Sequence, residues 1–116
     1  MSRMAEHLWD VLARDYGPVC QQLTKHFGAE FTVDSTGGGF YAICARLEGG
    51  HLVLITDGND AGLNPLDETE GFGVGVYEED GAGNSPRVYL RNTRPDPEAL
   101  LYLVGWALRA RAMQRC

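Results

Sequence analysis

The chain has 116 residues and a formal net charge of −6 at neutral pH. That length fits one domain, residues 1–116, with enough chain to bury a hydrophobic core. Because affinity for phosphate comes mainly from clustered Lys and Arg, the acidic charge argues against nucleic acid and anionic membranes as partners. The N-terminal residues form no continuous hydrophobic segment, so neither a secretory signal nor a membrane anchor is predicted, and a cytoplasmic location is expected.

An amphipathic helix is predicted from Met4 to Phe27, because its apolar residues fall within one half of a helical wheel. Gly17-Pro18 would ordinarily break a helix, but the apolar stripe stays in phase across the pair, which favours one kinked helix. Gly28 supplies the C-terminal stop. A strand from Glu30 to Asp34 and a turn at Gly37-Gly38-Gly39 are expected next.

The clearest hairpin follows, with strands from Phe40 to Glu48 and from His51 to Asp57. If Gly49-Gly50 forms a two-residue loop, Leu47 lies opposite Leu52. That register predicts a set of residues facing the helices, which comprises Tyr41, Ile43, Ala45, Leu47, Leu52, Leu54 and Thr56. The opposite face then holds Phe40, Ala42, Cys44, Val53 and Ile55 beside Arg46 and Asp57. It is more apolar than a solvated sheet face usually is, so a partner could cover it.

Asp57 to Gly71 is a polar, acidic connection that resembles a calcium-binding EF-hand loop at its first, third, sixth and twelfth positions. It departs at Ala61, which has no oxygen ligand, and in being entered from a strand. The candidate metal ligands are Asp57, Asn59, Asp60, Asp67 and Glu68. The alternative is a solvated turn with scattered carboxylates.

Strands are expected again from Phe72 to Glu78 and from Arg87 to Arg91. Gly71, Gly73 and Gly75 alternate with apolar residues, so all three lie on one face of the first of these strands. Glycine in a strand permits the close approach of another element, either an internal helix or a partner chain.

The final helix is predicted from Pro97 to Met113, with Asp96 as its cap. Ala99 to Leu108 contains no charged side chain, and its apolar residues point in every direction, so more than one face must be buried. This stretch is too short to span a bilayer, and the extra faces must meet protein, within the chain or on a partner. The predicted partner-binding residues are Leu101, Tyr102, Gly105, Trp106 and Leu108, together with Gly73 and Gly75.

The predicted fold is α+β, a single five-stranded and mainly antiparallel sheet with both terminal helices packed on one face. This order of elements resembles that of bacterial type III secretion chaperones, in which a short helix takes the place of the connection from Asp60 to Glu70. The similarity covers nearly the whole chain and lies in the topology, not in a residue signature. The resemblance implies a non-catalytic homodimer that binds an extended or partly folded client.

The leading functional hypothesis is a cytoplasmic, non-enzymatic protein-binding module of the chaperone, immunity or inhibitor type, with a protein partner or client and no cofactor. A calcium-binding module built on the acidic connection is one alternative. A small-molecule enzyme that uses Cys44, Arg46 and Asp57 on the sheet is another. The three cysteines and three histidines lack the spacing of a disulfide framework or a zinc site.

Overall fold

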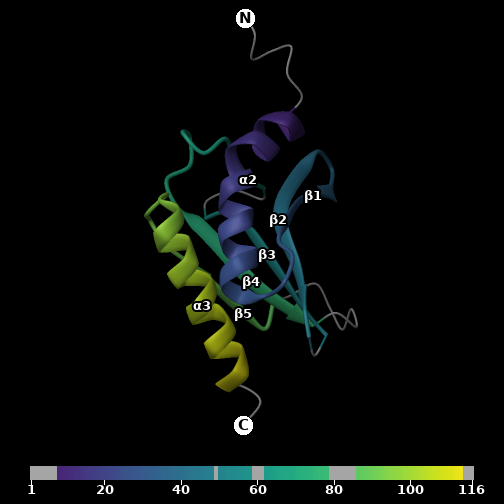
Figure 1. Cartoon of the computed structure of the whole chain (residues 1–116), viewed down its shortest axis with the longest axis vertical. Helices are drawn as coiled ribbons and strands as arrows, with labels where there is room; N and C mark the ends of the chain where they lie inside the picture. Colours follow the sequence, from purple (N-terminus) through teal and green to yellow (C-terminus); the bar gives the residue numbers. More distant parts are fainter. Residues whose placement is uncertain (1–7, 49, 59–61, 79–85, 114–116) are drawn as a thin grey trace, which may run out of the picture.

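The computed structural model describes residues 8–48, 50–58, 62–78 and 86–113 (Figure 1). In chain order the elements are α2 (Leu8–Phe27), β1 (Thr32–Gly37), β2 (Phe40–Leu47), β3 (His51–Asp57), β4 (Phe72–Glu78), β5 (Val88–Arg91) and α3 (Pro97–Met113). The strands form one antiparallel sheet in the order β1-β2-β3-β4-β5, and both helices lie on the same face of it. The predicted fold class is therefore confirmed.

Helix α2 passes through Gly17-Pro18 without ending, as the phase of its apolar stripe predicted. Pro18 is exposed, so its missing N–H falls on the solvent side of the helix. The helix ends at Phe27, and the next residue, Gly28, has a φ of 72° and donates its N–H to the carbonyl oxygen of Thr24 at 2.9 Å. The predicted first turn, from Met4 to His7, lies outside the described residues.

The hairpin register differs from the prediction by one residue on β3. Leu47 pairs with His51, not with Leu52, so the connection between the strands spans three residues instead of two. Because side chains alternate along a strand, this shift exchanges the two faces of β3. Val53 and Ile55 are fully buried against the helices with Ile43, whereas Leu52 and Leu54 lie on the opposite face. The expected faces of β2 were right, and those of β3 were wrong.

Boundaries of three strands also differ from the prediction, and of these β2 ends at Leu47, one residue earlier than expected. Strand β1 begins at Thr32 and continues to Gly37, and the turn that follows contains Gly38 and Gly39, which have φ values of 64° and 83°. Strand β5 begins at Val88, one residue later than expected.

The core lies between the two helices and the sheet. It is lined by buried apolar side chains from every layer, among them Leu12, Tyr16 and Leu23 of α2, Phe72, Val74 and Val76 of β4, and Leu100, Val104 and Ala107 of α3. The largest of these, Tyr16 and Phe72, meet edge to face, with ring centroids 6.2 Å apart. This single core fixes the inner faces of both helices and leaves the outer face of α3 to solvent.

Candidate functional site

The outer face of α3 exposes large apolar side chains. Trp106 is 60% exposed, Tyr102 is 66% exposed and Met113 is 70% exposed, although the opposite side of the same helix is buried in the core. With the exposed Glu98 and Arg109, these three form a line at spacings of three and four residues. We call this line the α3 stripe: Glu98, Tyr102, Trp106, Arg109 and Met113. A helix that serves only its own core exposes few such side chains, so this surface is a candidate for contact with protein.

The other predicted residues of α3 lie nearer to the core. Leu101 and Leu108 are half-buried and pack against it, and Gly105 faces α2, since a Cβ at this position would lie 4.0 Å from the ring of Phe27. The structure thus places Tyr102 and Trp106 at the surface and the three remaining residues along the side toward α2. Met113, Arg109 and Glu98 were not among the predicted partner-binding residues, although their spacing from Trp106 places them on its face.

Both ends of α3 are fixed by polar contacts. At the start, the Asp96 carboxylate accepts a hydrogen bond from the Ala99 N–H at 3.1 Å, which confirms the predicted cap. Toward the C-terminus, Arg111 donates a hydrogen bond to the Glu78 carboxylate at the end of β4. The two carboxylate oxygens of Glu78 also lie 3.7 Å from other nitrogens: Oε2 from Nδ1 of His51, and Oε1 from Nε of Arg87. The α3 stripe is therefore presented on a helix that is held at both ends.

The ion pairs of Glu78 predict a pH dependence of stability. The hydrogen bond from Arg111, followed by the nearby positive charges, holds the pKa of the Glu78 carboxyl below its usual range. A carboxyl with a lowered pKa in the folded state stabilises the protein above its unfolded-state pKa, and this contribution disappears as the pH falls through the folded-state pKa. We expect Glu78→Gln to lower the melting temperature at pH 7, and the difference from wild type to vanish in acid. Thermal unfolding of both proteins from pH 7 to pH 3 measures this.

The control for this experiment is Glu70→Gln, which removes the same charge from an exposed side chain in the connection before β4. We expect it to leave the melting temperature close to that of wild type. If the difference in melting temperature between Glu78→Gln and wild type stays constant across the pH range, the negative charge of Glu78 is not what stabilises the fold.

A second apolar surface lies on the face of the sheet opposite the helices, which no described element covers. We call it the open sheet face. Phe40 of β2 is 44% exposed there and Tyr89 of β5 is 48% exposed, and the half-buried Leu52, Leu54 and Tyr77 lie between them. The sequence indicated such a face, but its β3 residues are Leu52 and Leu54 instead of Val53 and Ile55. An uncovered apolar sheet face is a second candidate for contact with protein.

The glycines of β4 are covered by the chain's own tyrosines. A Cβ on Gly73 would lie 2.2 Å from the hydroxyl oxygen of Tyr89, and a Cβ on Gly75 would lie 2.8 Å from the ring of Tyr77. The expectation of an internal helix over these glycines was wrong, because both helices pack on the other face. The two tyrosine rings lie over the glycine backbone and give the open sheet face an aromatic centre.

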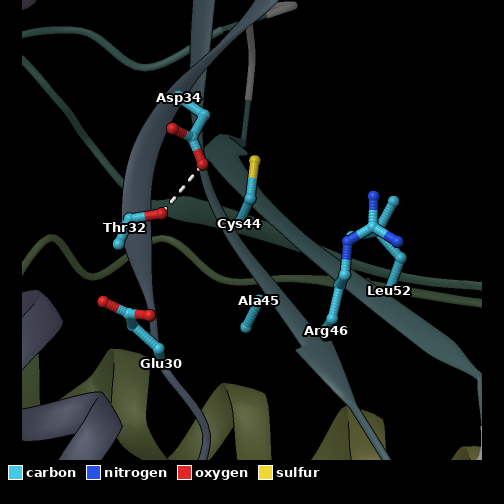
Figure 2. A pocket seen from close by; sticks show the side chains of 7 residues that line it. All are labelled: Glu30, Thr32, Asp34, Cys44, Ala45, Arg46 and Leu52. Carbon is cyan, nitrogen blue, oxygen red and sulfur yellow. Dashed lines mark hydrogen bonds between the residues drawn. The ribbon is translucent and has the colours of Figure 1, made fainter.

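A hollow of about 370 Å³ lies at the β1 side of the open sheet face, bordered by Glu30, Thr32, Asp34, Cys44, Ala45, Arg46 and Leu52. Figure 2 shows Asp34 accepting a hydrogen bond from Thr32, at 2.8 Å, beside the Cys44 thiol. Burial, and then the negative charge of Asp34, raise the pKa of Cys44 to about 11. At neutral pH this group is a thiol and a weak nucleophile.

The structure separates the residues that the enzyme hypothesis grouped together. Cys44 and Arg46 lie on the open sheet face, whereas Asp57 points into the helix side of the sheet, as the corrected β3 register requires. Asp57 is 4% exposed, and its Oδ2 accepts hydrogen bonds from Thr69 at 2.8 Å and from Asn64 at 3.0 Å. The predicted grouping of these three residues on one face was therefore wrong.

Asp57 belongs to a buried polar network that holds the connection from residue 62 to residue 71 against α2. The Tyr16 hydroxyl donates to the carbonyl oxygen of Asn64 at 2.7 Å, and the Leu66 N–H donates to the Asp15 carboxylate at 3.0 Å. Burial is the main cause that raises the pKa of Tyr16 to about 12, so the hydroxyl keeps its proton and remains a donor.

The five predicted metal ligands are dispersed or fall outside the described residues. Asp57 is engaged in the buried network, Asp67 and Glu68 are exposed on a turn, and Asn59 and Asp60 lie in the part of the connection that is not described. Within residues 8–48, 50–58, 62–78 and 86–113, no three His, Cys, Asp or Glu side chains are placed to hold a metal ion together.

No match was found among known protein families, characterised proteins or solved structures. Of the resemblance drawn from the sequence, only the α+β order of helix, five antiparallel strands and helix is confirmed, and no family is identified. Among the described helices, none combines the length and the apolar character needed to cross a membrane. The surfaces themselves, the α3 stripe and the open sheet face, are the basis for a functional assignment.

Proposed function

We propose that the chain is a non-enzymatic, cytoplasmic protein-binding module that contacts other protein through the α3 stripe and the open sheet face. One observation carries the proposal: Tyr102, Trp106 and Met113 are 60% to 70% exposed on a helix whose opposite side is fully buried. Large aromatic side chains are enriched among the residues that dominate binding energy at protein interfaces.

The arrangement of the two surfaces supports binding in preference to catalysis. Both helices lie on one side of the sheet (Figure 1), the exposed side chains of the α3 stripe lie opposite the buried side of α3, and the open sheet face is the side of the sheet without helices. Two surfaces on opposite sides allow two contacts at once, one with a partner copy and one with a client. The Cys44 thiol at the hollow, with its raised pKa, offers no activated nucleophile for an enzyme mechanism.

The test begins with chemical cross-linking in the source cells and identification of the protein joined to the tagged chain. That protein is then purified and titrated against wild type, Trp106→Glu on α3 and Phe40→Glu on the open sheet face. We expect at least one of the two variants to weaken binding by about 30-fold, the range of an interface hot spot.

Gln22→Glu is the matched control, because it adds the same charge to an exposed position on α2, outside both surfaces. Its affinity should equal that of wild type. Equal affinities for all four proteins, with circular dichroism confirming that each is folded, would exclude both surfaces as the binding site.

A further inference from the structure

The charges of the α3 stripe lie on either side of its aromatic pair. Glu98 lies about one turn before Tyr102, Arg109 lies about one turn after Trp106, and all four side chains are exposed. The guanidinium carbon of Arg109 lies 5.5 Å from the centre of the Trp106 ring, which keeps this charge on the stripe. A complementary surface must therefore supply an aromatic centre, a cation opposite Glu98 and an anion opposite Arg109.

A second α3 that runs antiparallel to the first supplies all three. The midpoint between Glu98 and Arg109 and the midpoint between Tyr102 and Trp106 lie half a residue apart, an offset of only about 0.75 Å along the helix. One two-fold axis at that level therefore brings Tyr102 opposite the partner's Trp106 and, at the same time, Glu98 opposite the partner's Arg109. A parallel pair would instead set each charge against its own kind, which is unfavourable.

We propose that the α3 stripe is a self-association site, at which two copies of the chain pair α3 against α3 in antiparallel orientation. This inference rests on the proposed function and names the occupant of one of its two surfaces. The charges favour a second copy over an unrelated basic protein, since the stripe itself is neutral and the acidic excess of the chain lies elsewhere.

The size and surroundings of the surface fit a weak, reversible dimer. Helix α2 lies beside α3 in the same layer (Figure 1), so the surface offered for pairing is the outward side of a single helix. One helix face buries an area at the lower end of the range for specific interfaces. The open sheet face stays free in this dimer.

Sedimentation velocity over a concentration series tests the pairing with complementary charge reversals. Glu98→Arg creates a chain with two cations on the stripe, and Arg109→Glu creates a chain with two anions. We expect each variant alone to dimerise at least about tenfold more weakly than wild type, because like charges then face each other. An equimolar mixture of the two variants should regain wild-type dimerisation as a heterodimer, since both ion pairs are restored: the pair of native Arg109 with native Glu98 is as in wild type, and the pair of the two substituted positions is reversed.

Arg46→Glu, an exposed charge reversal on the open sheet face, is the control and should dimerise like wild type, and circular dichroism verifies that every variant is folded. The proposal is overturned if wild type stays monomeric at every concentration, or if the mixture dimerises no better than its components. A monomeric wild type whose affinity for a separate purified protein is lost in Trp106→Glu would overturn self-association and leave the proposed function standing. Failure of both experiments would remove the proposed function as well.

Discussion

Gly71→Ala is expected to destabilise the fold by about 3 kcal/mol, a large effect for the addition of one methyl group. A Cβ at this position would lie 2.2 Å from the carbonyl oxygen of Asn92, which is backbone and cannot rotate away as a side chain can. Asn92 is itself fixed, because its N–H donates to the Phe72 carbonyl at 3.0 Å and its side-chain oxygen accepts from the Phe72 N–H at 2.9 Å. Relief of the clash must therefore disturb the pairing of β4 with β5. Urea unfolding followed by circular dichroism measures the change.

Gly17→Ala provides the matched control for this prediction. Gly17 lies inside α2, and apart from its two chain neighbours and the backbone of its own helix, no atom lies within 4 Å of a Cβ added there. Alanine is the better helix former, but a Cβ just before Pro18 disfavours the helical conformation, so we expect Gly17→Ala to change the free energy of unfolding by less than about 1 kcal/mol. Equal effects at the two glycines would show that the close approach of Asn92 to Gly71 is not rigid.

Asp57→Ala is expected to cost about 2 to 4 kcal/mol of stability, because it leaves the buried donors of Thr69 and Asn64 without their acceptor. The connection from residue 62 to residue 71 depends on that carboxylate for its attachment to the sheet, and α2 reaches the same segment through Tyr16 and Asp15. Denaturant unfolding gives the loss of stability. Proteolysis of the folded protein should show faster cleavage within the connection.

The control for this second prediction is Asp67→Ala, which removes an exposed carboxylate from the same connection. Exposed substitutions of this kind usually change stability by no more than about 0.5 kcal/mol. If Asp57→Ala lowers the free energy of unfolding no more than Asp67→Ala does, the Asp57 carboxylate does not organise the connection.

Local sequence signals were sufficient to predict the elements and their order. The apolar stripe of α2 runs through Pro18, the Asp96 cap marks the start of α3, and turn residues separate the strands. The face of each β3 residue was not predictable in the same way, because it depends on whether the hairpin connection has two or three residues. Val53 and Leu54 are both apolar, so the hydrophobic pattern alone cannot choose between the two registers.

The candidate surfaces could be predicted only in part, because they depend on which sides of the elements the core covers. A helix that is apolar on every side is recognisable in the sequence, and the structure shows which side the core takes: Leu100, Val104 and Ala107 are buried, while Tyr102 and Trp106 are exposed. The sequence could not show that Tyr77 and Tyr89 cover the β4 glycines, because cross-strand contacts depend on register. It also could not show that Asp57 is an internal acceptor, because its partners are supplied by tertiary structure.

The most direct test of the account is the fluorescence of Trp106 in a Trp9→Phe variant, which leaves Trp106 as the single tryptophan. Acrylamide quenching is measured as the protein concentration is raised, and again after addition of the partner identified by cross-linking. The account predicts that Trp106 is readily quenched in dilute protein and becomes protected, with emission at shorter wavelength, when the α3 stripe is covered by protein. Equally efficient quenching under all of these conditions would contradict it.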